Sequence, residues 1–243
     1  MRLLPEMLRM NRIGDQIAAF MLFGATITLP ATAACAQQED EQLWMQLNTN
    51  VPVSSSWRLT LEQIARLSDR QGGLYQTEFG GLISYKVARG VELGVGYRKV
   101  GTHNRNPAAN EDRVRQHIVV TFGNFFGRLR VDERFNPGGD EIGFRIRPLV
   151  RYNQPLTGKR LAVFVSHESF YLPNSTSWGQ RGGYERMRNI IGLTFPIGRV
   201  NTDIGYLNQF RPSRGGARSQ MDHALTLQLS VNLNGIFVPH ADD

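Results

Sequence analysis

Residues 166–169 place a possible nucleophile, a possible base and a carboxylate in consecutive positions (Ser-His-Glu-Ser). A serine hydroxyl becomes nucleophilic when an adjacent imidazole takes its proton. In a strand, neighbouring side chains point to opposite faces, so His167 and Ser169 can cooperate, whereas Glu168 cannot join them locally. Since no orienting acid is identifiable, we interpret the pair as two polar residues near an interface and keep nucleophilic catalysis as the alternative.

Arginines recur at every second position within several segments, which places them on one face of each expected strand. Buried charges must be paired, and the planar guanidinium suits that task. We therefore predict a salt-bridged network that fills a narrow barrel, with an anion-attracting pore as the alternative. The expected members are Arg113, Arg115, Arg128, Arg130, Arg134, Arg145, Arg147, Arg151, Arg186 and Arg188, faced by Asp132, Glu141, Glu168 and Asp203.

Metal and cofactor motifs are not apparent. The five histidines, at positions 103, 117, 167, 223 and 240, lack the close spacing of metal ligands. The chain carries no P-loop, no dinucleotide fingerprint and no repeat array. We therefore expect no metal and no cofactor.

These residues lie in a chain that alternates apolar and polar positions over long stretches. In 225–233, for example, leucine or valine occupies every second position, opposite Thr, Gln, Ser and Asn. Strands of about ten residues with one apolar and one polar face are typical of transmembrane β-barrels, which in single bacterial chains normally have an even strand number. Eleven candidate strands can be counted. We predict an all-β, antiparallel transmembrane barrel of 10–12 strands, with twelve favoured.

Two further patterns favour a barrel over a soluble β-sandwich. Short connections alternate with long ones, at 101–112, 173–183 and 211–220, that are rich in Gly, Asn, Ser and Arg. Aromatic residues gather near strand ends, where they can form girdles at two membrane interfaces. The expected girdle residues are Trp57, Tyr85, Tyr97, Phe122, Phe125, Phe126, Phe135, Tyr152, Tyr171, Phe195 and Phe210.

Residues 1–36 are predicted to be a cleaved signal peptide. Arginines precede an apolar stretch at roughly 17–29, and the Ala-Cys-Ala segment at 34–36 matches a small-residue cleavage site. The apolar stretch is short of the ~20 residues that a spanning helix needs. The mature chain is then one domain, 37–243, with a short polar tail. Acylation of Cys35, the only cysteine, is the alternative.

The net charge of +7 comes almost entirely from arginine, because lysine is scarce. A basic excess can indicate nucleic acid, but the arginines here are spread singly through strands, so we expect no nucleic acid. Arginines in the long loops match the geometry of phosphate. The expected partners are outer-membrane lipid, lipopolysaccharide and the barrel-assembly machinery, with the oligomeric state left open.

The runs at 128–134 (RLRVDER) and 144–147 (FRIR), with a Gly-Tyr pair at 96–97 and another at 205–206, resemble a family of predicted outer-membrane barrels known only as a domain of unknown function. The likeness covers about 43–233 and implies location and fold, without an activity. The His-x-Ser pair resembles the motif of lipid A deacylase barrels, which attacks ester-linked acyl chains. We expect an integral outer-membrane barrel, not an enzyme, with a structural or narrow transport role. A lipid A-modifying enzyme and a soluble periplasmic β-sandwich are the alternatives.

Overall fold

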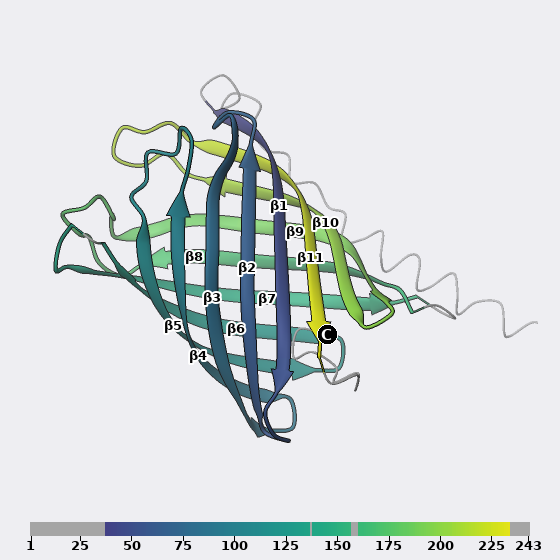
Figure 1. The fold of residues 1–243 in the computed structure, drawn as a ribbon. Coiled ribbons are helices and arrows are strands. Elements are labelled where there is room, and N and C mark those ends of the chain that lie inside the picture. Colours follow the sequence, from purple (N-terminus) through teal and green to yellow (C-terminus); the bar gives the residue numbers. More distant parts are fainter. Residues whose placement is uncertain (1–36, 137, 157–159, 234–243) are drawn as a thin grey trace, which may run out of the picture. The chain divides into compact units, whose positions relative to one another are not determined.

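The computed structural model describes residues 37–136, 138–156 and 160–233. In these ranges the chain forms one closed β-barrel (Figure 1), and no described helix could span a membrane. The predicted signal peptide, with Cys35, lies outside the described residues, as does the polar C-terminal tail. The strands are β1 (Gln38–Pro52), β2 (Trp57–Ser68), β3 (Gly73–Ala88), β4 (Val91–Thr102), β5 (Glu111–Phe122), β6 (Phe125–Phe135), β7 (Ile142–Pro155), β8 (Ala162–Leu172), β9 (Gly183–Ile197), β10 (Val200–Arg211) and β11 (Gln220–Asn232).

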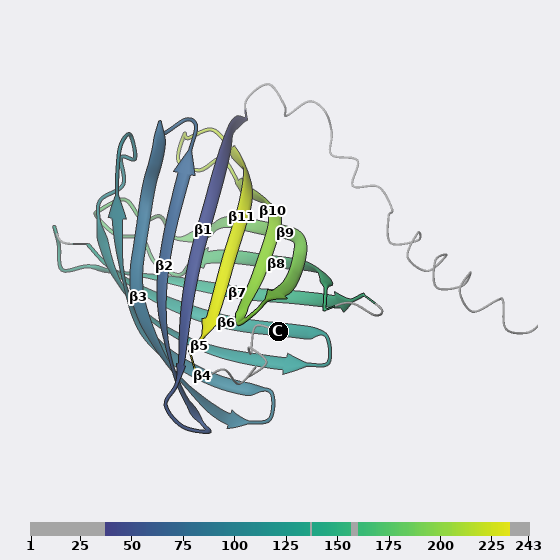
Figure 2. The same ribbon diagram turned by 45° about the vertical axis from the view of Figure 1, so that its right-hand side comes forward.

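The barrel closes through a parallel pair. Each strand pairs antiparallel with its neighbours in sequence, but β1 pairs parallel with β11, from Gln38 opposite Gln220 to Asn50 opposite Asn232 (Figure 2). With eleven strands, the first and last run in the same direction, so only a parallel ladder can join them. The preference for twelve strands is therefore wrong, whereas the count of eleven candidate strands agrees with the structure.

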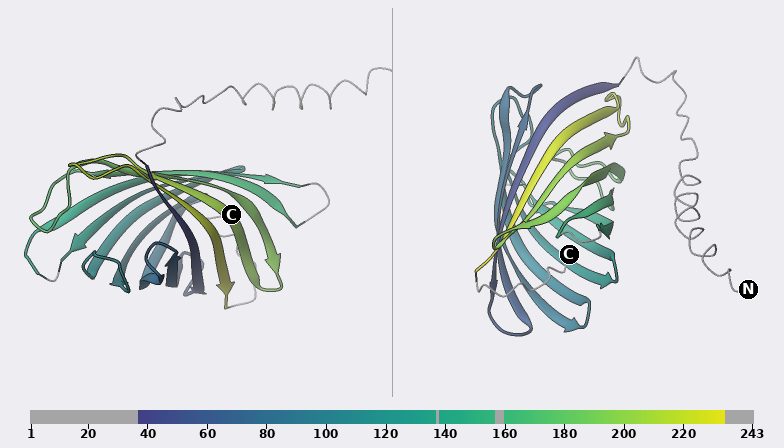
Figure 3. Two further views of the ribbon diagram at one scale, coloured as in Figure 1. Left: turned by 90° about the horizontal axis from the view of Figure 1, so that it is seen from above. Right: turned by 90° about the vertical axis from the view of Figure 1, so that its right-hand side faces the viewer.

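The strands are strongly tilted around the barrel. In Figure 1 the near strands β1–β3 cross the far strands β7–β9 steeply, and Figure 3 shows the same twist from two further directions. Tilt of this kind is required to close a sheet into a barrel. It brings side chains from many strands to the same level of the interior.

The connections differ at the two ends. The β4–β5, β8–β9 and β10–β11 loops are long and emerge at one end, here called the loop end. The opposite turn end has two-residue connections at 89–90, 123–124 and 198–199. Gly90, Gly123 and Gly198 have φ values of 72°, 57° and 61°, a conformation that glycine adopts without a steric penalty. The alternation of short and long connections agrees with the sequence prediction.

The barrel is apolar outside and polar inside. Every strand exposes at least one large apolar side chain on its outer face, whereas the buried apolar cluster is small, consisting of Trp44, Leu207 and Ala224. The sandwich alternative is wrong, because a single sheet closes on itself instead of two sheets packing face to face. Outer-face examples, one per strand from β1 to β11, are Met45, Leu61, Phe79, Val95, Val120, Leu129, Val150, Val165, Ile191, Ile204 and Leu225.

Aromatic side chains pair on the outer face near the turn end. The ring centroids of Trp57 and Tyr85 are 4.7 Å apart, and those of Phe125 and Tyr152 are 4.9 Å apart. Phe126 is an exception to the predicted girdle, since it is only 3% exposed and points inward. Strand alternation explains this, because its neighbour Phe125 takes the outward position.

Candidate functional site in the barrel interior

All ten arginines predicted to face the interior lie on inward strand positions. Arg186 is the most accessible of them, with 18% of its side chain exposed, and Arg115 is almost fully buried. Asp132, Glu168 and Asp203 also point inward, and Asp203 pairs with Arg151 at 2.6 Å. Period-two alternation places these charges on one face of each strand, and closure turns that face inward.

Glu168 on β8 is the centre of one ion-pair cluster. Arg147 on β7 donates from Nε to Oε1 at 3.1 Å and from Nη2 to Oε2 at 3.0 Å. Arg128 on β6 donates to Oε1 at 2.9 Å, and Arg188 on β9 lies 3.6 Å from Oε2. One buried carboxylate therefore links four consecutive strands.

Asp132 on β6 forms the adjoining cluster. Arg145 donates to Oδ2 from both Nε, at 3.0 Å, and Nη2, at 2.7 Å. Arg147 also reaches this oxygen, with its Nη1 at 3.3 Å. Arg147 thus bridges Asp132 and Glu168, so the two clusters form one network.

The sequence analysis missed further carboxylates in the interior, among them Glu62, Glu78 and Glu111. Arg98 on β4 bridges Glu62 on β2, at 2.9 Å, and Glu78 on β3, at 2.6 Å. Arg134 on β6 pairs with Glu111 on β5 at 2.8 Å. Strand alternation already placed Glu62 on a polar face. Its pairing with Arg98 on β4 depends on the β2–β3 and β3–β4 registers, which the sequence pattern alone does not give.

Glu141 does not belong to this network, contrary to our expectation. It is exposed and precedes the start of β7 at Ile142, so strand alternation does not fix its direction. Its carboxylate accepts a hydrogen bond of 2.5 Å from the backbone N–H of Ser177 in the β8–β9 loop. Its role is therefore to hold two loops together at the loop end.

Four arginines form a layer across the middle of the interior, which we call the arginine layer: Arg66, Arg98, Arg147 and Arg188. All four line both of two cavities in the barrel interior, here called the two main cavities, one of about 780 Å³ towards the loop end and one of about 230 Å³ towards the turn end. Two aromatic rings pack against arginines of this layer. Arg66 and Arg188 lie 4.2 and 4.6 Å from the ring centre of Trp44, and Arg147 lies 4.5 Å from that of Phe170.

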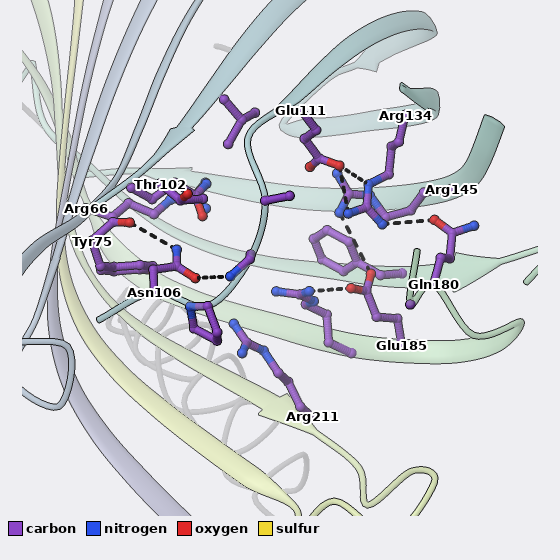
Figure 4. Close-up of a pocket in the computed structure, with 18 of the residues that line it drawn as sticks. Arg66, Tyr75, Thr102, Asn106, Glu111, Arg134, Arg145, Gln180, Glu185 and Arg211 are labelled. Carbon is purple, nitrogen blue, oxygen red and sulfur yellow. Dashed lines mark hydrogen bonds and ion pairs between the residues drawn. The ribbon is translucent and has the colours of Figure 1, made fainter. Parts of the chain in front are cut away.

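The cavity towards the loop end, the loop-end cavity, is strongly cationic. Thirteen arginines line it, against four carboxylates. Figure 4 shows Arg66, Arg134, Arg145 and Arg211 around it, carried by four different strands. Residues of the β4–β5 and β8–β9 loops, among them Arg105, complete the wall. The arrangement suits an anionic ligand, because guanidinium groups match phosphate and carboxylate in charge and shape.

Residues 41–220 match the model of DUF2490, a family described as a protein of unknown function. The chain belongs to the DUF2490 family. An uncharacterized protein of Methylorubrum extorquens is 34% identical over 221 residues, which cover 85% of this chain and 95% of that protein. The predicted membership of a family of unknown function is confirmed.

A solved structure titled "Unveiling the Mechanism Behind the in-meso Crystallization of Membrane Proteins" is also similar to the DUF2490 chain. It aligns over 75% of this chain and 79% of its own, with 12% identity and a TM-score of 0.39. A likeness of this degree supports no functional argument. The function of the DUF2490 barrel has to be argued from its own side chains.

Arg130 is the exception among the interior arginines of the DUF2490 barrel. It is only 6% exposed, and its Nε has no hydrogen-bond partner. Among the described residues no carboxylate lies within ion-pair distance of it, although it lines the cavity towards the turn end beside Arg128 and Arg147. A buried cation without a carboxylate partner is costly.

His167 and Ser169 lie together on the outer face of the DUF2490 barrel, 2.9 Å apart between Nε2 and Oγ. The structure adds Asn189 from β9, whose Oδ1 lies 2.7 Å from His167 Nδ1. The sequence analysis missed Asn189 because only the β8–β9 register brings residues 22 positions apart to directly opposite sites. Among the described residues, no group of three or more His, Cys, Asp or Glu side chains could hold a metal.

Proposed function

We propose that this protein is an integral barrel of the bacterial outer membrane. Support comes from the apolar side chains that all eleven strands expose on the outer face. Soluble monomers rarely expose continuous apolar patches of more than a few hundred Å². A barrel can cross lipid because closure satisfies every backbone hydrogen bond. The long loops then face the cell exterior and the short turns face the periplasm, as in other such barrels.

Within that membrane the interior of the barrel is closed to the free passage of ions and small solutes. The protein binds anions in its loop-end cavity. The observation that carries this proposal is a cavity with thirteen arginines and four carboxylates above a floor formed by the arginine layer. On the cell exterior, this cavity meets ligands that carry phosphate or carboxylate groups. The phosphorylated headgroups of lipopolysaccharide belong to this class.

Narrow anion transport is the second candidate. The same four arginines line both main cavities, so movement of these side chains alone can join the cavities into one path. Transport requires that the layer opens while the protein works. A sealed binding protein keeps it closed.

Two measurements test the proposal. Cell fractionation should place the full-length protein with the outer membrane, and its gel mobility should change on heating, as a folded barrel unfolds. In a planar lipid bilayer the purified protein should conduct little current. Recovery in the soluble periplasmic fraction contradicts the membrane assignment, and a stable anion-selective current replaces the sealed barrel with the transport candidate.

A further inference from the structure

We propose that His167, Ser169 and Asn189 form a catalytic triad on the outside of the barrel that hydrolyses acyl esters of membrane lipids. This activity is separate from anion binding in the interior and shares with it only the membrane location. It uses the outer face of β8 and β9, whereas the cavities lie on the inner face.

The hydrogen bonds fix the tautomer of the neutral imidazole. Asn189 Oδ1 can only accept, so His167 Nδ1 carries the proton of that 2.7 Å bond. The other ring nitrogen, Nε2, then presents its lone pair to the Ser169 hydroxyl at 2.9 Å. A nucleophile, a base and a group that orients the base are the three parts of a serine hydrolase triad, and asparagine can be the orienting group.

The strands hold these groups in place. His167 lies directly opposite Asn189 in the β8–β9 ladder, and Ser169 follows two residues later on the same face. Between them, Glu168 points inward and is held by Arg147, Arg128 and Arg188. The interior ion pairs therefore fix the backbone that carries the base and the nucleophile. Such rigidity favours catalysis, which depends on accurate positioning.

The triad lies where the apolar outer face gives way to polar residues. Towards the turn end, its neighbours on β8 and β9 are Val165 and Ile191, both exposed. At the same ladder level, polar side chains continue on β10 and β11, with Asn208 opposite Asn189 and His223 opposite Asn208.

Towards the loop end, Tyr171 and Tyr184 are exposed. Tyrosine at such a level is typical of a membrane–water interface. With the long loops outside the cell, this level meets the headgroup and ester region of the outer leaflet, where water is present. The substrate class is therefore a lipid acyl ester.

The reaction balances with water as the co-reactant. Ser169 Oγ attacks the carbonyl carbon of the ester while His167 Nε2 takes the hydroxyl proton. The bond from carbon to the alcohol oxygen breaks, and the leaving alkoxide receives that proton. Water, deprotonated by the same imidazole, then attacks the acyl-serine. The products are a fatty acid and a lipid with one acyl chain fewer, and Ser169 regains its proton.

The test uses the purified full-length barrel in detergent micelles. One arm supplies a long-chain phosphatidylcholine and the other supplies lipid A, with release of free fatty acid as the readout. An independent readout is labelling by a long-chain sulfonyl fluoride, located by peptide mass spectrometry. We expect fatty acid release in at least one arm and a label on Ser169. The arm that responds identifies the lipid class.

Matched variants distinguish a loss of catalysis from a loss of folding. Ser169→Ala should abolish both fatty acid release and labelling, and His167→Ala should reduce the rate by about 10²–10⁴-fold. Asn189→Ala should give a smaller loss. Asn208→Ala and His223→Ala, which alter the same polar level outside the triad, should keep full activity, and heat-dependent gel mobility should show every variant folded. If neither lipid is cleaved and Ser169 is not labelled, or if Ser169→Ala hydrolyses at the wild-type rate, the proposal is wrong.

Discussion

Arg147 and Glu168 form a two-pronged ion pair inside the barrel, with Nε–Oε1 and Nη2–Oε2 distances of 3.1 and 3.0 Å. Both side chains are buried, and the pair joins β7 to β8. Arg147 also belongs to the arginine layer, and Glu168 separates the two outward residues of the proposed triad. This one ion pair thus connects the arginine layer, the proposed seal of the interior, with the outer face.

Replacing Glu168 with Ala should cause a large loss of stability. The substitution removes the only carboxylate that contacts Arg128 within ion-pair distance in the described structure, and it also unpairs Arg188. Breaking a buried pair typically costs about 3–5 kcal/mol, and less where water enters. The temperature at which the folded band disappears on a gel measures the change. The control is Asp140→Ala, an exposed loop carboxylate, which should stay near wild type; equal midpoints for both variants would show that the cluster contributes little.

Two arginines on neighbouring strands should respond in opposite ways to the same substitution. Arg145→Met leaves Asp132 with one arginine contact instead of two, so unfolding should occur at a lower temperature. Arg130→Met removes a buried cation that has no carboxylate partner in the described structure, so stability should stay equal or rise. Urea titration in micelles compares the two directly. Strong destabilisation by Arg130→Met would mean that this guanidinium is paired in solution, for example with a bound anion.

Strand alternation made the inward arginines predictable from the sequence. Arg145 and Arg147 share a face with Arg151 because each strand residue points opposite to its neighbour, whatever the strand pairs with. Pairing partners on other strands were not predictable in this way. Glu78 pairs with Arg98 on the adjacent strand, and a pairing register depends on turn geometry.

The same distinction applies to the outer face and to the strand number. The His167–Ser169 pair follows from alternation within β8, whereas Asn189 depends on the β8–β9 register. Glu141 was misplaced because the sequence does not mark where β7 begins. The preference for twelve strands came from a general rule about even numbers, and the parallel β1–β11 closure departs from that rule.

Anion binding in the loop-end cavity should depend on arginines at that end only. Arg105→Gln and Arg211→Gln each remove a cation from the cavity wall, so affinity for inorganic pyrophosphate should fall, as measured by calorimetry. Arg199→Gln changes an exposed arginine at the turn end and is the matched control. Added sodium chloride should weaken binding to the intact protein, because salt screens charges at an accessible site. Unchanged affinity in both cavity variants would remove the loop-end cavity as the binding site.

The seal itself should fail when the arginine layer loses the two side chains that stack on Trp44. In the double variant Arg66→Ala and Arg188→Ala, the guanidinium groups 4.2 and 4.6 Å from that ring are gone, so the two main cavities should join. We expect little current from the intact protein in a planar bilayer and a larger, anion-preferring current from the variant, because most arginines of the wall remain. Arg186→Ala, which lines the loop-end cavity without belonging to the layer, should leave the current low. Strong anion-selective current from the intact protein would show that the layer does not seal the barrel. A double variant that conducts no more current than the intact protein, but still migrates as a folded barrel, would instead place the barrier at another level of the interior.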